Sequence, residues 1–551
     1  MKKGDIVEGT VVRYDYPGQG VLTAEGREIF LKGVLPGQKV RCRIKKKNAS
    51  RCEAILLEVI ERSPLEQDSS CLHFPECGGC QMQTIPYQEQ LDIKSEQIRR
   101  LLESALENPD PEWFEGIKPS PVQDGYRNKM EFTFGDAFKG GPLVLGMHKK
   151  GSFYDIVDTT DCAIVDADLR AVRNAVKHLA EETGYPYYHR LTHTGFFRHL
   201  LVRKARHSGQ ILVDLVTTTQ ILTASQMQEV ERKLVEVLTQ LSLEGTVTGI
   251  LHTCNDSVAD TIQNDRTDLL YGEACITETL LGMEFQITPF SFFQTNSAGA
   301  EVLYDTVRSY IGDTKDKVIY DLYSGTGTIA QILAPVAKHV TGVEIVEEAV
   351  EAARRNARQN HLSNCEFICG DVLKVIDSMP LKPDMIVLDP PRDGIHPKAL
   401  PKILKYGVDT IVYISCKATS LKRDLKVMQQ AGYRVRKTAL VDLFPGTCHV
   451  ETVCLLSQRK PDTTIEVDLD ISELEVSSAE TKATYEEIKS YVLKKFGLKV
   501  SNLYIAQVKR ECGIVERINY NLPKTEGNRV PQCPEDKRKA IKDAFIHFQM
   551  I

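Results

Sequence analysis

A cysteine between an apolar segment and a polar one is the first candidate for chemistry in this sequence. Cys416 stands in YISCKATS, after apolar residues and before Lys417 and Thr419. Free cysteines are among the most buried residue types, so a buried structural thiol is the default interpretation. A thiolate is also a nucleophile and a metal ligand. The surrounding segments have to decide between these roles.

A glycine-rich turn follows an apolar strand pattern well before this cysteine. The segment VIYDLY, which contains Asp321, runs into SGTGTIA, where Gly325 and Gly327 let a ligand approach the backbone. Such a turn lies at the carboxyl end of a strand, where open α/β sheets bind ligands. Glu344 ends the next predicted strand about 20 residues on, placed to accept hydrogen bonds from a ribose diol. Asp371 ends the third predicted strand.

The chemistry of this edge suits one class of cofactor. Three acids stand there, and the turn carries no basic group that would bind a phosphate. S-adenosylmethionine has a ribose, an adenine and a cationic sulfonium but no phosphate, so the sequence predicts that this cofactor binds here.

The segment DPPRDG follows the fourth predicted strand. Its two prolines favour a rigid, extended turn, which would fix Asp389 beside the cofactor. Methyltransferases that modify amino groups commonly carry an aromatic residue after the two prolines, to stack a flipped base. Arg392 stands there instead. The turn therefore argues against methylation of a base nitrogen and leaves methylation of a carbon open.

Cys416 ends the fifth predicted strand, at the same edge, and this position favours a nucleophile. C5 of a uracil reacts poorly on its own, but a thiolate that adds to C6 makes C5 enolate-like and able to take a methyl group. A base must then remove the C5 proton so that the thiol can leave. Glu451 in FPGTCHVE is the preferred base. His449, two residues earlier and on the same face of a strand, is the alternative.

A second group of cysteines has the density of a metal centre. Cys71, Cys77 and Cys80 lie within CLHFPECGGC, and Cys162 in TDCAI is the candidate for a fourth ligand. Spacing alone leaves zinc and an iron–sulfur cluster both open. His73 is a further candidate zinc ligand.

The elements that must position these residues fall into five predicted segments. Short strands predict a small β-barrel, an α+β pattern follows, and strands that alternate with helices predict a doubly wound, mainly parallel α/β sheet. A long amphipathic helix over 83–108 is expected to pack on the catalytic domain. The predicted segments are the barrel 1–62, a central region 63–290, the α/β domain 291–457, an acidic linker 458–483 and a basic, α-rich extension 484–551.

Composition sets broad limits. The chain of 551 residues is 42% hydrophobic and 26% charged, as globular domains are, and its net charge of −6 means that any basic surface is local. The N-terminal MKKGDIVEG lacks an apolar signal segment, and no run reaches the ~18 apolar residues of a membrane span. The 15 cysteines are expected to be reduced thiols or ligands. We expect a cytoplasmic monomer without a membrane partner.

On the segments FFQTN, DLYSGTGT, DPPRDG, SCKATS and HVETV, in this order and spacing, the chain resembles the S-adenosylmethionine-dependent RNA (uracil-5-)-methyltransferases over about residues 1–457. The resemblance implies that Cys416 is the nucleophile and Glu451 the base. It implies that Phe292 packs on the target base and that the barrel is an RNA-binding TRAM domain. Residues implied to line the cofactor and uracil site are Gln294, Tyr323, Glu344 and Asp389, and residues implied to contact RNA phosphates are Arg127 and Lys129, in YRNKMEF.

The resemblance also bears on the metal and the substrate. It implies that Cys162 completes a [4Fe–4S] site, and the four cysteines with the barrel resemble the branch that modifies 23S ribosomal RNA. The tRNA branch, which usually lacks both features, is the close alternative, and a catalytically silent RNA-binding module is a third interpretation. Two departures stand out. Ser324 replaces a frequent Cys, and Lys417-Ala418 replaces the usual Asn-Pro. We expect the ammonium of Lys417 to lower the pKa of the Cys416 thiol.

Overall fold

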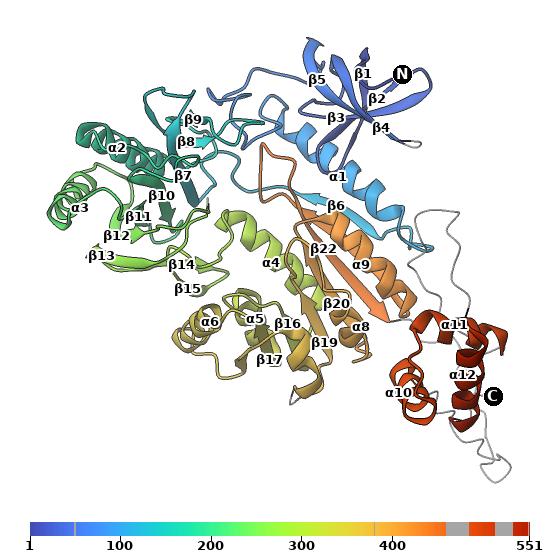
Figure 1. Cartoon of the computed structure of the whole chain (residues 1–551). Helices are drawn as coiled ribbons and strands as arrows, with labels where there is room; N and C mark the ends of the chain where they lie inside the picture. The colour runs from blue at the N-terminus through green and yellow to red at the C-terminus, as the bar shows by residue number, and fades with distance from the viewer. Residues whose placement is uncertain are drawn as a thin grey trace. The chain divides into compact units, whose positions relative to one another are not determined.

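The computed structural model describes residues 1–48, 51–259, 261–379, 381–458, 484–512, 533–548 and 550. The chain forms two compact units, Met1–Lys460 and Pro461–Ile551, both drawn in Figure 1. From residue 459 onward, the segment predicted as an acidic linker, 458–483, lies outside the described residues. No helix in the described ranges is long and apolar enough to cross a membrane.

The first five strands close into a small barrel, as the sequence predicts, in the order β1-β2-β3-β5-β4 (blue in Figure 1). Alternate residues of each strand fill its interior, because successive side chains of a strand point to opposite faces. In β4 the buried residues are Val40, Cys42 and Ile44, and the basic residues between them face outward. The strands are β1 (Ile6–Asp15), β2 (Gln19–Ala24), β3 (Arg27–Lys32), β4 (Lys39–Lys47) and β5 (Cys52–Glu61).

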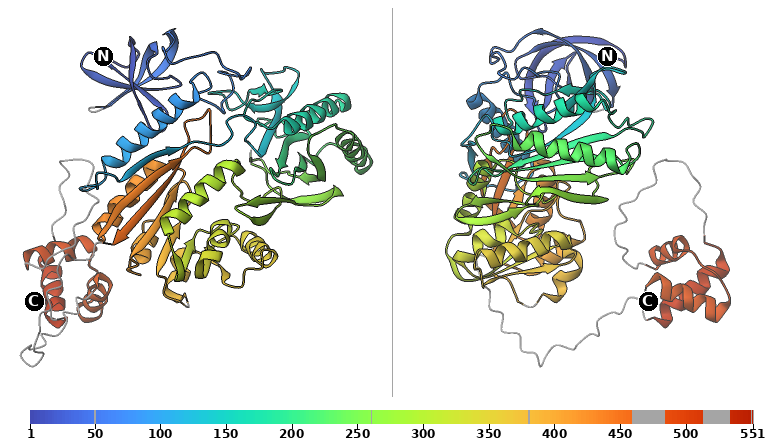
Figure 2. Two further views of the ribbon diagram at one scale, coloured as in Figure 1. Left: turned by 180° about the vertical axis from the view of Figure 1, so that it is seen from behind. Right: turned by 90° about the vertical axis from the view of Figure 1, so that its left-hand side faces the viewer.

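The central region is built on a seven-stranded sheet in the order β13-β12-β11-β10-β7-β8-β9. Helices α2 and α3 pack on one face of it, since their apolar residues share a buried cluster with the central strands (Figure 2). The elements are β7 (Lys129–Asp136), β8 (Leu143–His148), β9 (Ile156–Asp158), α2 (Ala167–Thr183), β10 (Phe197–Lys204), β11 (Gln210–Thr217), α3 (Ala224–Thr239), β12 (Thr246–Cys254) and β13 (Arg266–Gly272); a hairpin of β14 (Ile276–Leu280) and β15 (Met283–Ile287) follows.

An eight-stranded sheet, ordered β18-β17-β16-β19-β20-β22-β21-β6, forms the predicted α/β domain together with β6 from outside its predicted range. Its first five strands are parallel, which confirms the predicted doubly wound class. The strand β22 runs antiparallel to both of its neighbours. Its strands are β16 (Thr314–Leu322), β17 (Ala337–Glu344), β18 (Cys365–Cys369), β19 (Met385–Leu388), β20 (Thr410–Ser415), β21 (Tyr433–Val441) and β22 (Glu451–Gln458), with β6 (Phe114–Lys118) at the edge beside β21.

Helices cover both faces of this sheet. Apolar residues of α4, α5 and α6 pack on one face, and those of α1, α8 and α9 pack on the other. Both α1 and β6 come from the range predicted as the central region (Figure 2). Helix α1 packs on the eight-stranded sheet, where the helix over 83–108 is expected, whereas β6 belongs to this sheet without having been predicted there. The helices are α1 (Tyr87–Glu103), α4 (Ser297–Ile311), α5 (Thr328–Leu333), α6 (Glu347–Gln359), α7 (Val372–Val375), α8 (Ala399–Leu404) and α9 (Ala418–Gln430), and two short 3-10 turns lie at Ala334–Val336 and Ile376–Ser378.

The second unit contains α10 (Tyr485–Phe496), α11 (Asn502–Glu511) and α12 (Glu535–His547). Apolar residues of all three helices share one buried cluster, which includes Ile488, Ile505 and Phe545. The predicted α-rich extension is therefore a small helical unit with its own core.

A buried ion pair joins α1 to the segment that leads into β22. Lys94 Nζ donates to Asp442 Oδ1 at 2.8 Å and to the carbonyl oxygen of Phe444 at 3.2 Å. The Lys94 and Asp442 side chains are 1% and 0% exposed. Burying two charges is unfavourable unless they pair and form further hydrogen bonds. The pair therefore fixes the start of the 442–450 segment against α1.

Removing one partner of this pair should be costly. Lys94→Met leaves the Asp442 carboxylate buried without a cation, which typically costs about 3–5 kcal/mol. Lys94→Met with Asp442→Leu should recover most of this loss, because an apolar pair needs no compensation. Hydrogen exchange at residues 443–450, measured against urea concentration, reports the local free energy of opening.

Lys437→Met is the matched control, since Lys437 pairs with Glu115 at 2.8 Å on the same sheet but is 53% exposed. It should leave exchange in this segment unchanged. Equal effects of the two single substitutions would contradict a special role for the buried pair.

Candidate active site and cysteine cluster

Two predicted catalytic side chains, Cys416 and Glu451, lie at one edge of the eight-stranded sheet. Cys416 directly follows β20, and Glu451 begins β22, with Ser415 opposite Thr452 in the ladder. Because β22 is antiparallel, its first residue lies at the edge where the parallel strands end. Burial raises the pKa of the Cys416 thiol to about 11, and the negative charge of Glu451 is the next largest cause. The two groups therefore lie close together, and the site formed by Cys416 with Glu451, Asp389 and Arg392, whose charges all act on the thiol, is called the pocket from here on.

Two carboxylates of this pocket, buried Glu451 and half-buried Asp389, have high pKa values. Burial, and then the charge of Asp389, raise the pKa of Glu451 to about 8. Burial alone raises the pKa of Asp389 to about 7. Both shifts follow from the cost of placing a negative charge out of contact with water. The alternative base, His449, is exposed, whereas Glu451 is 4% exposed. The structure therefore places Glu451, not His449, inside the pocket.

Arg392 supplies the positive charge that acts on the thiol. Its guanidinium hydrogen-bonds to Cys416, and both this bond and its charge lower the thiol pKa. The hydroxyl of Ser420, in α9, donates to the carbonyl oxygen of Arg392 at 2.7 Å. The loop is anchored to α9 again where the Ile395 N–H donates to Asp424 Oδ2 at 2.9 Å. Sequence reasoning used Arg392 only as a missing aromatic residue and overlooked this contact.

The expected effect of Lys417 is therefore corrected. Its Nζ lies 3.5 Å from Asp393 Oδ1, at the molecular surface. Lys417 is the residue before α9 and has extended backbone angles, φ −139° and ψ 92°. Arg392, and not Lys417, is the cation among the groups that act most strongly on Cys416.

The glycine-rich turn has the shape of a ligand cradle. A Cβ atom added at Gly325, where φ is +53°, would meet open space. One added at Gly327 would lie 2.5 Å from the Phe367 ring, so this glycine allows close packing beneath the turn. Tyr323 has a left-handed φ of +70°, a strained conformation that is common at functional sites. Asp371 lies near it, since its charge adds to the burial that raises the pKa of Tyr323 to about 12.

Glu344 is already engaged with the backbone of this turn. Its Oε2 accepts from Gly325 N at 3.0 Å, and its Oε1 accepts from Ile345 N and Val346 N at 2.8 and 2.9 Å. A carboxylate has about four acceptor positions, so one or more remain for a ribose hydroxyl. The carboxylate therefore orients the turn as well as facing the site.

Unpaired polar atoms at this turn fit a polar ligand. Asp321 is fully buried; its Oδ2 accepts from Ala330 N at 3.0 Å, and its Oδ1 has no partner. The hydroxyl of Ser324 is also buried without a partner. Burial raises the pKa of Asp321 to about 8, with the charge of Asp389 contributing next. Together with the open space over Gly325, these groups fit the ribose and adenine of S-adenosylmethionine.

The loop before α4 carries two predicted residues. The Phe292 ring is 70% exposed and free to stack on a base. The Gln294 side chain hydrogen-bonds to Tyr304, whose buried hydroxyl feels the charges of Asp389 and Glu451. Tyr304 is therefore a pocket residue, and nothing in its sequence context indicated this. The buried guanidinium of Arg203 holds the loop by donating to the carbonyl oxygens of Pro289 and Ser291.

The two predicted phosphate-binding residues lie in the central region, Lys129 at the start of β7 and Arg127 two residues before it. Arg127 lies near both Cys80 and His449, since its charge lowers the pKa of each. Lys129 pairs with Glu131 at 2.6 Å. Lys129 lines a cavity of about 500 Å³ that His199 and Phe290 also line. Arg127 therefore lies beside the cysteine cluster, and Lys129 lies at a cavity that borders the loop before α4.

The four predicted metal-binding cysteines converge from two distant segments. Burial and the charges of the other thiols raise the pKa of Cys162 to about 12 and of Cys80 to about 11. Cys77 Sγ accepts from Gly79 N at 3.4 Å, and Cys80 Sγ accepts from Gln83 Nε2 at 3.4 Å. His73, the candidate zinc ligand, accepts instead from the Asp161 N–H through its Nε2 at 3.2 Å.

The segment after these cysteines supports the loop that carries the base. The N–H groups of Gln81 and Met82 both donate to the carbonyl oxygen of Gly446, at 3.0 and 2.9 Å. The side-chain oxygen of Gln81 accepts from Cys448 N at 3.2 Å. Glu451 follows Cys448 by three residues, so the cysteine cluster and the base share one support.

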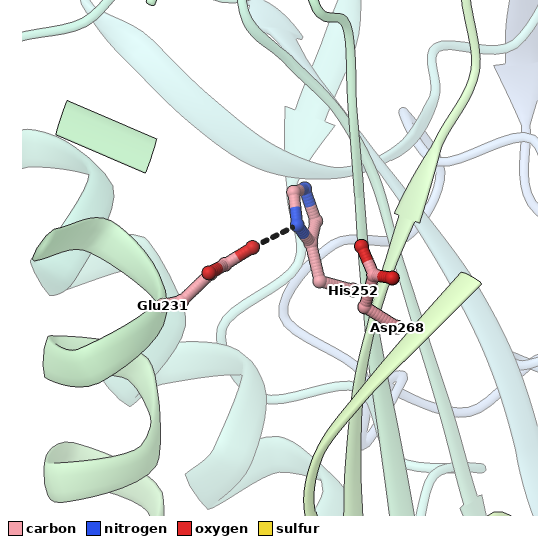
Figure 3. A group of neighbouring side chains, drawn as sticks. All are labelled: Glu231, His252 and Asp268. Atoms are coloured by element: carbon pink, nitrogen blue, oxygen red, sulfur yellow. Dashed lines mark hydrogen bonds and ion pairs between the residues drawn. The ribbon is translucent and has the colours of Figure 1, made fainter. Parts of the chain in front are cut away.

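Another group of potential metal ligands lies in the central region, where Glu231 of α3, His252 of β12 and Asp268 of β13 meet (Figure 3). The two ring nitrogens of His252 are both engaged, Nδ1 with Glu231 Oε1 and Nε2 with Thr217 Oγ1, each at 2.8 Å. Asp268 accepts from Arg266 at 2.9 Å. We interpret the group as a hydrogen-bonded tie between helix and sheet.

Known proteins match this chain over most of its length. The family model for tRNA (uracil-5-)-methyltransferase matches residues 276–459. An uncharacterized RNA methyltransferase of Clostridium tetani is 47% identical over 463 residues, which cover 84% of this chain and 99% of the relative. Another, of Caldanaerobacter subterraneus, is 45% identical and covers 83% of this chain and 100% of the relative.

A solved structure has the same fold. The tRNA (uracil-54, C5)-methyltransferase of Pyrococcus abyssi, in complex with S-adenosyl-L-homocysteine, aligns with a TM-score of 0.64 and 25% identity, over 82% of this chain and 100% of that one. The sequence matches and this fold agree with the pocket of Cys416, Glu451 and the glycine-rich turn. The chain belongs to the S-adenosylmethionine-dependent RNA (uracil-5-)-methyltransferase family.

Proposed function

We propose that this enzyme methylates C5 of a uridine in 23S ribosomal RNA through a covalent adduct between Cys416 and C6. The observation that carries the proposal is the shared pocket of a thiol and a buried carboxylate, Cys416 and Glu451, at the cofactor edge of the sheet. A nucleophile and a base within reach of one carbon pair are what this chemistry requires.

The reaction balances as follows. The Cys416 thiol loses its proton to solvent, and the thiolate adds to C6, which moves electrons toward C5 and O4. S-adenosylmethionine, when bound, would supply the methyl group that C5 gains, and its sulfonium sulfur would keep the electron pair of the broken S–CH3 bond and leave as the thioether S-adenosylhomocysteine. Glu451 then takes the C5 proton, the C6–S bond breaks, and the thiolate is restored. Arg392 stabilises the thiolate before the attack and after the release, since its hydrogen bond and charge both lower the thiol pKa.

The raised pKa of Glu451 suits a base. A carboxyl group with a pKa of about 8 accepts a proton more readily than an ordinary glutamate and is still partly ionised at neutral pH. Both Glu451 and the thiol must be deprotonated, so activity should rise with pH through the neutral range.

Six residues are proposed to hold the cofactor. The turn at Gly325 approaches it, Glu344 accepts from the ribose, and Asp371 lies beside Tyr323 at the same edge. Asp389 and Gln294 stand between the cofactor and the uracil, where both meet Tyr304. The six are Gln294, Tyr323, Gly325, Glu344, Asp371 and Asp389.

RNA is proposed to reach the pocket over the central region and the barrel. Phe292, largely exposed, stacks on the extruded uracil, as enzymes that modify a base within folded RNA require. Arg127 and Lys129 contact phosphates on the approach, and the outward basic residues of the barrel add further contacts. Such contacts position RNA without reading its sequence. We propose that the enzyme acts in the cytoplasm.

The four cysteines are proposed to hold a [4Fe–4S] cluster. Within the described residues, only Glu231, His252 and Asp268 bring three ligand atoms within 4.8 Å of one another, so no three of the thiols are that close. The family resemblance favours an iron–sulfur cluster over zinc. The two hydrogen bonds to sulfur fit the surroundings that tune such centres.

A tRNA substrate is the second candidate. The matching family model and the Pyrococcus abyssi structure are both named for tRNA methyltransferases. The cysteine cluster and the barrel favour ribosomal RNA, by the resemblance of both to that branch.

Incubation with labelled S-adenosylmethionine and either 23S rRNA or tRNA tests the function. We expect 5-methyluridine in 23S rRNA, with Cys416→Ala abolishing product because no adduct forms. Glu451→Gln should accumulate the adduct, because the C5 proton is not removed, and denaturing gels would show it. Methylation of tRNA alone would reject the ribosomal assignment, and turnover by Cys416→Ala would reject the covalent mechanism.

Arg392→Leu should raise the pKa of the Cys416 thiol and slow its alkylation, because the thiolate loses its hydrogen bond and its nearest cation. Iodoacetamide labelling of the Cys416 peptide across pH, read by mass spectrometry, measures this. Every unit by which the thiol pKa rises lowers the thiolate fraction about tenfold at pH values below it. Lys417→Leu is the matched control and should leave the dependence of Cys416 labelling on pH unchanged. If Lys417→Leu slowed the labelling and Arg392→Leu did not, Lys417 would be the cation that lowers the thiol pKa.

Anaerobic purification should give four iron and four sulfide per chain, as the proposed [4Fe–4S] stoichiometry requires. Cys162→Ser should lose most of the iron, since this residue bridges from a distant segment to the other three. Cys365→Ser, a cysteine of β18 outside the cluster, is the control and should keep the iron. Stoichiometric zinc without iron would show that the cluster assignment is wrong.

A further inference from the structure

The barrel reaches into the catalytic pocket through the turn between β1 and β2. The Tyr16 hydroxyl lies 3.4 Å from the carbonyl oxygen of Cys416 and donates to it. The same phenolic oxygen accepts the backbone N–H of Ala418. A tyrosine hydroxyl can donate and accept at once, so one side chain bridges both sides of Lys417.

We propose that Tyr16 is a positioning residue for catalysis, which holds the backbone of Cys416 and the start of α9 so that the thiol faces the uracil site. The proposal rests on the proposed role of Cys416. It gives the barrel a task in the chemical step in addition to RNA binding.

The start of α9 needs this contact. The first N–H groups of a helix have no partner within the helix. Lys417, which occupies the capping position, makes no side-chain hydrogen bond to them. Tyr16 therefore replaces a missing cap for the N–H of Ala418, the first residue of α9. Position 418 is also where the sequence departs from Asn-Pro, and only a residue with a backbone N–H can form this bond.

The turn that carries Tyr16 is firmly seated. At Gly18, where φ is +70°, an added Cβ would lie 3.3 Å from both Cys448 Sγ and the Tyr14 hydroxyl. From the other side, Arg100 of α1 donates to the carbonyl oxygen of Tyr14 at 3.0 Å. The turn therefore packs between α1 and the segment that leads to Glu451.

The surroundings keep the hydroxyl protonated and therefore able to donate. The pKa of Tyr16 is raised to about 12, mainly by burial and to a smaller extent by negative charge on Cys416, Cys448 and Glu451. These causes also show that the phenol faces the nucleophile and the base together.

Tyr16→Phe removes only the hydroxyl and keeps the ring. We expect kcat to fall about tenfold with KM for RNA unchanged, the size of effect that loss of a hydrogen bond produces. Alkylation of Cys416 in the RNA-free enzyme should also slow at pH values below the pKa of the thiol, because the thiol is no longer held in position for its hydrogen bond with Arg392.

Tyr433→Phe is the matched control. It removes an equivalent bond, from the Tyr433 hydroxyl to the carbonyl oxygen of Val408 at 2.9 Å, at the end of β21 far from the site, where Tyr433 pairs with Gln458 and not with Glu451. This variant should keep kcat and the alkylation profile.

Ala418→Pro removes the N–H that Tyr16 accepts. Proline is well tolerated at the first position of a helix, and the extended backbone of Lys417 suits a residue before proline. If Tyr16 and Ala418 act through one contact, Ala418→Pro should lower kcat less in the Tyr16→Phe enzyme than in the wild-type enzyme.

Three outcomes would overturn the proposal: a Tyr16→Phe enzyme with wild-type kcat and alkylation, fully additive losses for Tyr16→Phe and Ala418→Pro, or equal losses in Tyr433→Phe. The alkylation comparison uses no RNA and no cofactor. It therefore judges the role of Tyr16 even if the wild-type enzyme methylates neither rRNA nor tRNA, a result that would reject the proposed function instead.

Discussion

The buried ion pair of Lys94 and Asp442 is the constraint on which the active site depends. It anchors α1 to the segment before Glu451 at a point where neither charge reaches water. Around it, α1 makes two further connections, from Gln90 to the carbonyl oxygens of Met82 and Ile85, next to the cysteines, and from Arg100 to the barrel. One helix thereby connects the barrel, the cysteine cluster and the segment that leads to Glu451, the proposed base, although these parts are distant in sequence.

The pocket itself is rich in acidic groups. Glu451 and Asp321 are buried, Asp389 is half-buried, and each has a raised pKa. Such a site favours a cationic cofactor, since a sulfonium relieves the repulsion among the acids, and it disfavours a thiolate. Arg392 opposes the effect of the acids on the thiol, because its charge and hydrogen bond favour the Cys416 thiolate. The acids at the cofactor edge favour a cationic cofactor, and Arg392 beside Cys416 favours the thiolate. The site can meet both requirements because the acids and the guanidinium act at different places.

Sequence patterns predicted what depends on local order. Alternating strands and helices gave the sheet, and residues at strand ends, such as Cys416 and Asp389, were expected at its ligand edge because that edge follows from the direction of the strands. Contacts between distant segments were beyond the same reasoning. Tyr16 and Cys416 are 400 positions apart, and the direction of the Lys417 side chain depends on its pairing with Asp393. The membership of β6 in the catalytic sheet depends likewise on a partner strand that no local pattern identifies.

The place of β6 has a consequence for how the chain is made. This strand pairs in parallel with β21, and its Glu115 meets Lys437, which is 322 positions later. A ribosome therefore completes the entire central region and most of the catalytic domain before β6 has a neighbour to bond with. Until then, its backbone groups form an open edge, which invites pairing with other chains. Contacts of such long range also fold slowly, so the order of synthesis leaves this short strand unpaired for a long interval, and the charges of Glu115 and Lys118 are a fitting protection, because charged side chains on an edge strand disfavour pairing with other chains.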